Sequence, residues 1–336
     1  MSRYTKLTEL MTGVGMLGGP DPADLLPMAA PELKGVDEAT WEAVLAQAAE
    51  PDAASIARSS LENGRFFLEA RDALRGRRPL RIEWKGPHRT PGDEVAPVDL
   101  RVDHVYLVSC KYLSDITVNA SPSHLFDRLL TGGHGHRAGD WFDEVAPHEH
   151  HSLFHAAVAW LGRSSAATSA SELPQPERKA IAKLLAGRSW PDELTAGYEA
   201  LVTAASEESA RRWRAALDRA GRGADESMLW RLLRIGSAPY FVLGSNRADS
   251  VRMRVGSPWD WRQAYALRSF EVVPAVTGQP RVDWSAAFVD REAACEREVR
   301  GQVEIRWSHG RFSGPPEAKV YLDTPHSEVP GYFPLR

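Results

Sequence analysis

Three short runs of alternating apolar and polar residues lie between residues 80 and 112, and they constrain the fold more than any other segment. They cover residues 80–85, 95–102 and 104–112. Alternation with a period of two predicts β-strands, and the close spacing of the last two predicts a hairpin. The Gly- and Pro-containing residues 86–93 predict a loop before it.

Helices are predicted on both sides of these strands. Residues 37–49 and 52–74 carry helical signals, and the second segment spaces its apolar residues along one face. After the strands, Ser121 as N-cap and Pro122 in the first turn predict a helix to about Leu130. The order helix, three strands, helix indicates an α/β (α+β) fold.

The rest of the chain divides by composition. Residues 131–139 form a Gly- and His-rich loop, 151–161 an apolar segment and 163–175 a linker, followed by predicted helices at 175–187 and 191–220. Short β-like runs follow at 240–243, 251–255, 269–276, 299–307 and 319–322, with a helical piece at 290–298. We therefore expect an irregular leader (1–36), an N-terminal domain (37–163), a helical linker region (164–234) and a C-terminal α+β domain (235–336) for recognition or docking.

Composition narrows the class of protein. A chain of 336 residues with 43% hydrophobic and 26% charged residues is typical of a soluble globular protein of about two domains. We find no bilayer-length apolar run and no signal peptide, and two cysteines cannot build a disulfide framework, so we expect a cytoplasmic protein without a membrane partner. The net charge of −4 argues against a generally basic surface but allows a local phosphate-binding groove.

Candidate catalytic residues lie on the predicted hairpin. Asp99 is on its first strand, and Ser109-Cys110-Lys111 ends its second. Residues two apart on a strand share a face, so Ser109 and Lys111 point together and Cys110 points the other way. A carboxylate that binds a divalent cation, beside a lysine that orients a water, suits hydrolysis of a phosphodiester.

This arrangement resembles the PD-(D/E)xK nuclease superfamily, which includes many type II restriction enzymes, over roughly residues 50–160. The resemblance implies a core of a helix, a three-stranded antiparallel sheet, a helix and a further strand. It also implies a Mg²⁺-dependent DNA endonuclease (Mn²⁺ can substitute) in restriction or anti-phage defence, acting as a homodimer or with a defence-complex partner protein.

Ser109 departs from the family pattern, which ordinarily has a second carboxylate there. It matches a Ser-x-Lys branch whose missing carboxylate comes from the following helix, where Asp127 is the candidate. On the preceding helix, Glu69, or with less support Glu62, is the further candidate metal ligand.

Two literal Glu-x-Lys motifs compete with this assignment. Glu83-Trp84-Lys85 falls on the first strand with Asp72 upstream on a helix, so it lacks the required strand pair. Glu317-Ala318-Lys319, with Glu304 on the strand before it, has a hairpin context and stays an alternative active site.

Basic residues suggest contacts with nucleic acid. We assign DNA-backbone contacts to a stretch that precedes the hairpin, against the alternative of a solvated junction: Arg75, Arg77, Arg78, Lys85 and Arg89. A second set interleaves arginines with aromatic residues, which suits base stacking, although we expect at least one of its two tryptophans in the core: Arg247, Arg252, Arg254, Trp259, Trp261, Arg262, Tyr265 and Arg268.

Histidines offer a competing metal site. His134, His136, His148, His150, His151 and His155 carry imidazoles that bind transition metals, but their spacing matches no standard zinc motif. We favour a loop that contacts phosphate or solvent for this region. Three functions therefore stay open: the endonuclease, a catalytically inactive nucleic-acid-binding or assembly subunit with a nuclease-like fold, which Ser109 supports, and a histidine-cluster metalloenzyme.

Overall fold

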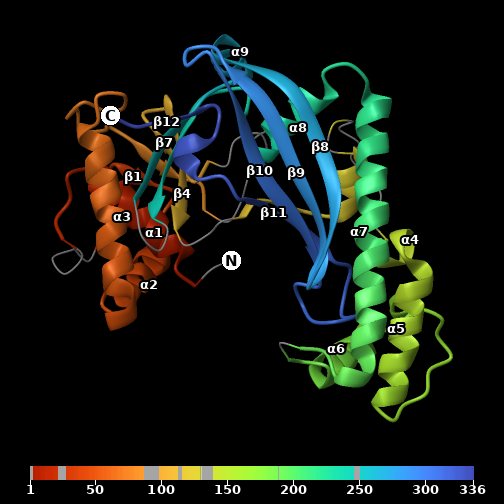
Figure 1. Cartoon of the computed structure of the whole chain (residues 1–336). Helices are drawn as coiled ribbons and strands as arrows, with labels where there is room; N and C mark the ends of the chain where they lie inside the picture. The colour runs from red at the N-terminus through yellow and green to blue at the C-terminus, as the bar shows by residue number, and fades with distance from the viewer. Residues whose placement is uncertain are drawn as a thin grey trace. The chain divides into compact units, whose positions relative to one another are not determined.

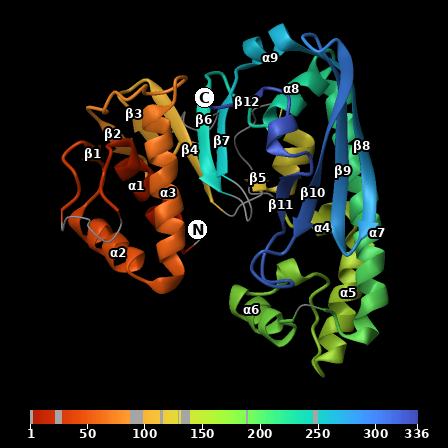
Figure 2. The same ribbon diagram turned by 60° about the vertical axis from the view of Figure 1, so that its left-hand side comes forward.

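The structure is a computed structural model, and it describes residues 3–21, 28–86, 98–112, 116–128, 130, 139–187, 189–245 and 250–336. The chain folds into two compact units, each built from separate stretches of sequence (Figures 1 and 2). Unit 1 comprises Met1–Asp115, Arg234–Tyr265 and Pro325–Arg336, and unit 2 comprises Ile116–Leu233 and Ala266–Thr324. The fold is mixed α+β, in agreement with the class that the sequence predicts.

A seven-stranded sheet forms the centre of unit 1, in the order β1-β2-β3-β4-β6-β7-β12. Its strands are β1 (Leu33–Lys34), β2 (Ile82–Trp84), β3 (Leu100–Val102), β4 (Tyr106–Tyr112), β6 (Tyr240–Ser245), β7 (Ser250–Val255) and β12 (Tyr332–Pro334). β3 pairs antiparallel with both β2 and β4, so the predicted three strands and their hairpin are confirmed. β6 then pairs with β4 in parallel.

Helices cover one face of this sheet. They are α1 (Thr5–Met16), α2 (Glu38–Ala48) and α3 (Pro51–Glu69), and a further helix, α9 (Pro258–Ala264), follows β7. α1 and α3 lie side by side against the sheet (Figures 1 and 2). Leu10 and Phe67 from these helices are fully buried in one apolar core with Ile82, Leu100 and Leu243 from the strands.

The prediction that residues 1–36 form an irregular leader is wrong, because they contain α1, which is almost wholly buried, and β1. Its glycines suggest a helix breaker, but Gly15 is where α1 and α3 make their closest contact. A Cβ on Gly15 would lie 2.1 Å from the carbonyl oxygen of Leu61 and 2.9 Å from the Cα of Gly64. Two glycines facing each other therefore allow the two backbones to touch.

Unit 2 contains a five-stranded sheet in the order β5-β11-β10-β9-β8. Its strands are β5 (Ile116–Ala120), β8 (Tyr265–Thr277), β9 (Gln279–Asp290), β10 (Cys295–Arg306) and β11 (Glu317–Leu322). Its helices are α4 (Trp141–Val145), α5 (Pro147–Trp160), α6 (Gln175–Leu184), α7 (Asp192–Ala220) and α8 (Ala224–Leu232). α7 lies between the sheet and α5 (Figure 1).

Short helical turns complete the structure: η2 (His124–Arg128), η3 (Ala170–Glu172) and η4 (His326–Glu328). η2 replaces most of the helix predicted at 121–130, and the Ser121 hydroxyl accepts the His124 amide at 3.3 Å, as a cap does. No helix within the described ranges is long and apolar enough to cross a membrane.

The predicted domain boundaries are wrong. Residues 164–233 belong to unit 2 and include its helices α6, α7 and α8, and the predicted C-terminal domain is divided between the units. The cause is non-local pairing, since β6, β7 and β12 join the sheet that the N-terminal strands begin. Such pairing leaves no signal in local composition.

Two local predictions also need correction. The charged segment 290–298 is the β9–β10 hairpin, not a helix, because Cys295 pairs with Asp290 and the ladder continues to Glu304 and Arg281. The helix predicted to end at residue 74 ends at Glu69. Pairing across the hairpin overrides a weak helical propensity.

Gly15→Ala tests the α1–α3 contact. The added methyl group meets backbone atoms that cannot move independently, so we expect a loss of about 3 kcal/mol in the free energy of unfolding. Gly13→Ala is the matched control, because a Cβ there meets only side-chain atoms, the nearest being Leu33 Cδ1 at 3.1 Å. Its stability should stay within about 1 kcal/mol of wild type. Urea unfolding followed by circular dichroism measures both, and equal losses would contradict the close backbone crossing.

Candidate functional site

Asp99, directly before β3, lies beside Ser109 in the middle of β4. The Ser109 hydroxyl donates to Asp99 Oδ2 at 3.2 Å, and the backbone amide of Cys110 donates to the same oxygen at 2.6 Å. Leu100 pairs with Val108, but the Asp99 amide donates to the Val108 carbonyl, so the regular ladder ends here. Beyond the end of the ladder, the Asp99 carboxylate, in place of a backbone carbonyl, accepts the hydrogen bond of the Cys110 amide. This bond and the one from Ser109 hold the carboxylate in position.

Alternation along β4 separates two environments. Val108, Cys110 and Tyr112 point toward the helices, where the Tyr112 hydroxyl lies 3.0 Å from Thr12 Oγ1. Ser109 and Lys111 therefore point to the opposite face. Ser109 is fully buried there, whereas Lys111 is partly exposed at the end of the strand.

Three charged groups surround the partly buried thiol of Cys110. Burial is the main cause that raises the pKa of Cys110; Asp99 and Glu9 add to it through their negative charge, and Lys111 opposes it. Glu9 is a buried acid of α1 whose Oε2 accepts the indole N–H of Trp84 at 2.6 Å. Glu9 therefore lies on the helix-covered face of the sheet, whereas Ser109 and Lys111 point to the opposite face.

Glu69 lies toward the other end of β4. Asn63 of α3 donates to the hydroxyl of Tyr112, the last residue of β4, at 3.2 Å. Past the end of α3, the Ala73 carbonyl accepts from the hydroxyl of Tyr106, the first residue of β4, at 3.1 Å. Glu69 is therefore exposed at the level of the start of β4, away from Lys111.

The other two supplementary acids have different surroundings. Glu62 is exposed on α3 and acts on Arg252 through its charge. Asp127 belongs to unit 2, where its Oδ2 lies 3.4 Å from the guanidinium of Arg212. Its predicted part in a metal site stays a prediction.

The first competing motif forms ion pairs instead of a metal site. Glu83 lies between Arg81, at 2.8 Å, and Arg101, which donates a short hydrogen bond to it. The hydrogen bond from Arg101 lowers the pKa of Glu83 to about 2, against the opposing effect of burial and with support from Arg81. Two guanidinium groups therefore hold this carboxylate in its charged form.

The second competing motif does cluster. Lys319 faces Glu304 across β10 and β11, and its Nζ lies 3.4 Å from Glu317 Oε2. Lys319 also lines a cavity of about 700 Å³ within unit 2, with Trp190, Tyr198 and Arg311. Glu304 is paired with Arg306 at 3.6 Å, so cations already neutralise the acids of this cluster.

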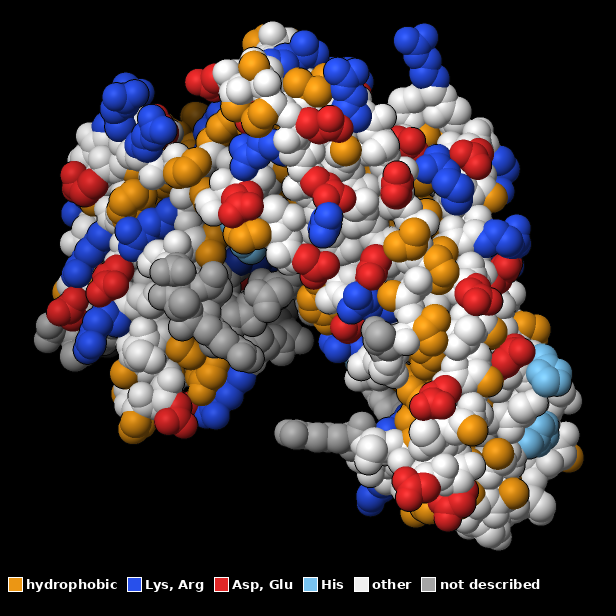
Figure 3. Space-filling view, in the orientation of Figure 1, with side chains coloured by type: hydrophobic (Ala, Val, Ile, Leu, Met, Phe, Trp, Pro, Cys, Tyr) orange, Lys and Arg blue, Asp and Glu red, His pale blue; other side chains and the backbone are white. Residues whose placement is uncertain are grey.

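The predicted backbone-binding arginines are exposed and paired with acids. Arg77 lies 3.8 Å from Asp103 and Arg78 lies 3.0 Å from Glu32, with about two thirds of each arginine side chain exposed. Such exposed pairs contribute only about 0–1 kcal/mol, so phosphates can displace them. Charges of both signs are interspersed on the face drawn in Figure 3. Arg75 and Lys85 lie among the described residues, and Arg89 lies outside them.

The arginine–aromatic set divides between core and surface. Trp261 is fully buried, which confirms the expectation for one tryptophan, and Trp259 is 69% exposed. Arg252 donates to Asn63 Oδ1 at 2.8 Å and lies 4.2 Å from the centre of the Phe66 ring. This arginine therefore supports the packing of α3. Arg247 lies outside the described residues.

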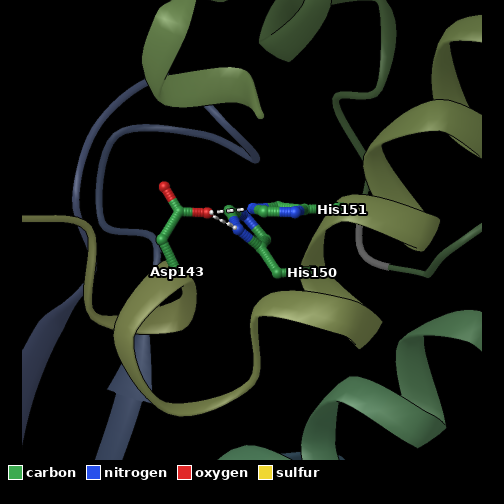
Figure 4. Close-up of side chains that lie close together, drawn as sticks. All are labelled: Asp143, His150 and His151. Atoms are coloured by element: carbon green, nitrogen blue, oxygen red, sulfur yellow. Dashed lines mark hydrogen bonds and ion pairs between the residues drawn. The ribbon is translucent and has the colours of Figure 1, made fainter. Parts of the chain in front are cut away.

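In unit 2, two of the predicted histidines converge on an acid that sequence reasoning missed. His150 Nδ1 lies 2.7 Å from Asp143 Oδ1, and His151 Nε2 lies 3.1 Å from the same oxygen (Figure 4). His148 and His155 are exposed on α5, and His134 and His136 lie outside the described residues.

Two acids, Glu9 and Asp143, were therefore not predicted. Glu9 stands alone in the apolar run that forms α1, and an isolated acid on a buried helix face is a signal that could have identified it. Asp143 gives no such signal, because its partners come from separate helices and a loop.

We compared the chain with protein-family models, with curated proteins and with solved structures, and none of them matches it.

The Glu83 pairs predict a pH dependence of stability. A carboxyl group with a lowered pKa stabilises the fold above its ordinary pKa of 4.5, and this contribution disappears as the pH falls toward 2. In Glu83→Gln the contribution is missing, so the difference in unfolding free energy between wild type and variant should shrink over that range. Urea unfolding at several pH values measures it, with the exposed Glu69→Gln as control. A difference that is constant with pH would contradict the ion-pair assignment.

Proposed function

We propose that this protein is a metal-dependent DNA endonuclease whose active site lies at the ends of β3 and β4. The observation that carries the proposal is the Asp99 carboxylate anchored beside Ser109-Cys110-Lys111 on neighbouring antiparallel strands. Lys111 lies two residues beyond Ser109 on the same face of β4, and with Asp99 it forms the pair to which we assign catalysis.

The strand order of unit 1 supports this proposal. The resemblance implies a helix, three antiparallel strands, a helix and a further strand. In unit 1, α3 precedes β2, β3 and β4, and β6 is the further strand, parallel to β4. Most of unit 2 lies between β4 and β6 in the chain, with α8 directly before β6, as a large insertion in such a core would.

The residues present fit a magnesium ion. Mg²⁺ prefers oxygen ligands and needs only one or two carboxylates beside water and substrate. Asp99 would hold it, with the hydroxyl of Ser109 fixing the orientation of that carboxylate. When bound, the ion would stabilise the negative charge that develops on the phosphate.

The protein's own groups would prepare the reaction. Two donors fix the Asp99 carboxylate before substrate binds, so little reorganisation is needed at that group. Lys111, on the face opposite the helices, would orient the attacking water and add positive charge near the phosphate. The exposed Arg77 and Arg78 would bind the DNA backbone without reading its sequence.

A second site is favoured by one specific observation. A cluster of Glu304, Glu317 and Lys319 lies beside a cavity, which favours a site there. Against it, β10 pairs antiparallel with β9 and β11, and β11 pairs antiparallel with β5, whereas the nuclease core needs a parallel strand. The same plasmid assay separates this site from the first.

A catalytically inactive nucleic-acid-binding subunit is the remaining alternative. Serine in place of a carboxylate at position 109 and the two hydrogen bonds to Asp99 are compatible with it. Such a protein would bind DNA with a steep salt dependence and would not cut it.

We expect the purified protein to cut supercoiled plasmid DNA with Mg²⁺ or Mn²⁺. Asp99→Asn and Lys111→Ala should each lower the cleavage rate by at least about 100-fold, because each removes a group that acts on the developing charge. Matched controls are Glu69→Gln and Lys319→Ala, which should cut at the wild-type rate. Circular dichroism and melting temperatures establish that each variant is folded.

Each outcome has a separate meaning. Loss of cleavage in Lys319→Ala with retention in Lys111→Ala would move the active site to unit 2. Loss of cleavage in Glu69→Gln would restore Glu69 as a second carboxylate. An effect of Asp127→Asn equal to that of Asp99→Asn would support the predicted role of Asp127. Salt-dependent binding without cleavage by wild type would replace the endonuclease with the inactive subunit.

A further inference from the structure

Asp143 is the centre of a compact polar cluster in unit 2. Its carboxylate lies within hydrogen-bonding distance of two imidazoles, His150 Nδ1 at 2.7 Å and His151 Nε2 at 3.1 Å (Figure 4). One ligand atom from each of the three residues lies within 4.8 Å of the other two. Asp143 comes from α4, and both histidines come from the first turns of α5.

The local fold brings these residues together. Asp140 caps α4 by accepting the Phe142 amide at 3.0 Å, and Pro147 begins α5 directly after Ala146. The sharp turn between the two helices points Asp143 back toward His150 and His151. The cluster therefore depends on short-range geometry within one unit.

Two serines hold the carboxylate from the other side. The Ser169 hydroxyl lies 2.9 Å from each Asp143 oxygen, and the Ser171 hydroxyl donates to Oδ2 at 2.7 Å. Burial works to raise the pKa of Asp143, but the hydrogen bonds from His150, Ser171 and Ser169 hold it well below its usual range. Outer partners that orient a ligand carboxylate in this way are typical of metal sites.

Packing positions His150 as well. Its ring is fully buried, with the rings of Phe142, Trp307 and Phe312 at centroid distances of 5.6–6.0 Å. Its Nε2 has no hydrogen-bond partner among the described residues. An apolar side chain would fill this aromatic pocket without leaving a polar atom unsatisfied. The polar contact of His150 is therefore made by Nδ1, which points at Asp143.

We propose that Asp143, His150 and His151 bind a zinc ion. Two imidazole nitrogens and one carboxylate oxygen are a donor set that Zn²⁺ favours. Tetrahedral zinc with bonds of about 2.0–2.2 Å spaces its ligand atoms roughly 3.3 Å apart. The two distances from Asp143 Oδ1 are shorter than this, and the two imidazole nitrogens lie within 4.8 Å of each other, so the side chains would shift to admit the ion.

The surroundings leave one coordination position open. The side chains of Asp143 and His151 are 21% and 29% exposed, so water reaches the cluster from that side. Three protein ligands and one water complete a tetrahedron. The zinc would tie α4, α5 and the turn at η3 together, independently of the β3–β4 site.

Metal binding to the full-length protein without a histidine tag tests this proposal. After dialysis against Zn²⁺ and then buffer, wild type should retain one zinc per chain, and Co²⁺ should give the strong visible absorption of a tetrahedral site. His151→Ala should weaken zinc affinity by at least about 100-fold. Ser171→Ala should weaken it by about 10-fold, because it loosens the carboxylate.

His155→Ala is the matched control. His155 lies one turn further along α5, is exposed, and does not belong to the cluster, so this variant should bind zinc as wild type does. Asp99→Asn should also keep full zinc binding. Circular dichroism establishes that His151→Ala is folded. Absence of bound zinc in wild type, or equal zinc affinity of His151→Ala and His155→Ala, would overturn the proposal and leave Asp143 as a purely structural hydrogen-bond acceptor.

Discussion

The parallel pairing of β6 with β4 is the constraint on which unit 1 depends. It joins residues 108–112 to residues 241–245, which lie more than a hundred positions later in the chain. Gly244 makes this pairing possible, since a Cβ there would lie 1.7 Å from the carbonyl oxygen of Lys111. Asn63 of α3 then donates to the Gly244 carbonyl at 2.8 Å and ties the helix to the joined strands.

This pairing also determines the surroundings of the candidate nuclease site. Lys111 lies opposite Gly244, so β6 fixes the strand end that carries the lysine, whereas β3 pairs with residues 106–108 at the other end of β4. The end of the β3–β4 ladder fixes Asp99 through a side-chain hydroxyl and a backbone amide. A strand thus holds Lys111, and two hydrogen bonds from β4 hold Asp99, which directly precedes β3.

Acids in this protein have different roles according to their partners. Glu83 and Glu317 are paired with cations, so their charge is already neutralised. Asp99 and Asp143 accept hydrogen bonds from hydroxyl groups, and an oriented carboxylate of this kind is suited to binding a cation.

The sequence alone determined the strands at 82–84 and 106–112, their hairpin, α2 with its Asp37 cap, and the long helix α7. Each depends on local periodicity or on a capping side chain, which a sequence displays directly. The hairpin also places Asp99 beside Ser109, because a short turn fixes the register of its two strands. Only the tertiary structure decided that α1 is buried, that Glu9 of this helix meets Trp84 of β2, and that β6 joins β4. These features arise from contacts between distant segments, which no local pattern encodes.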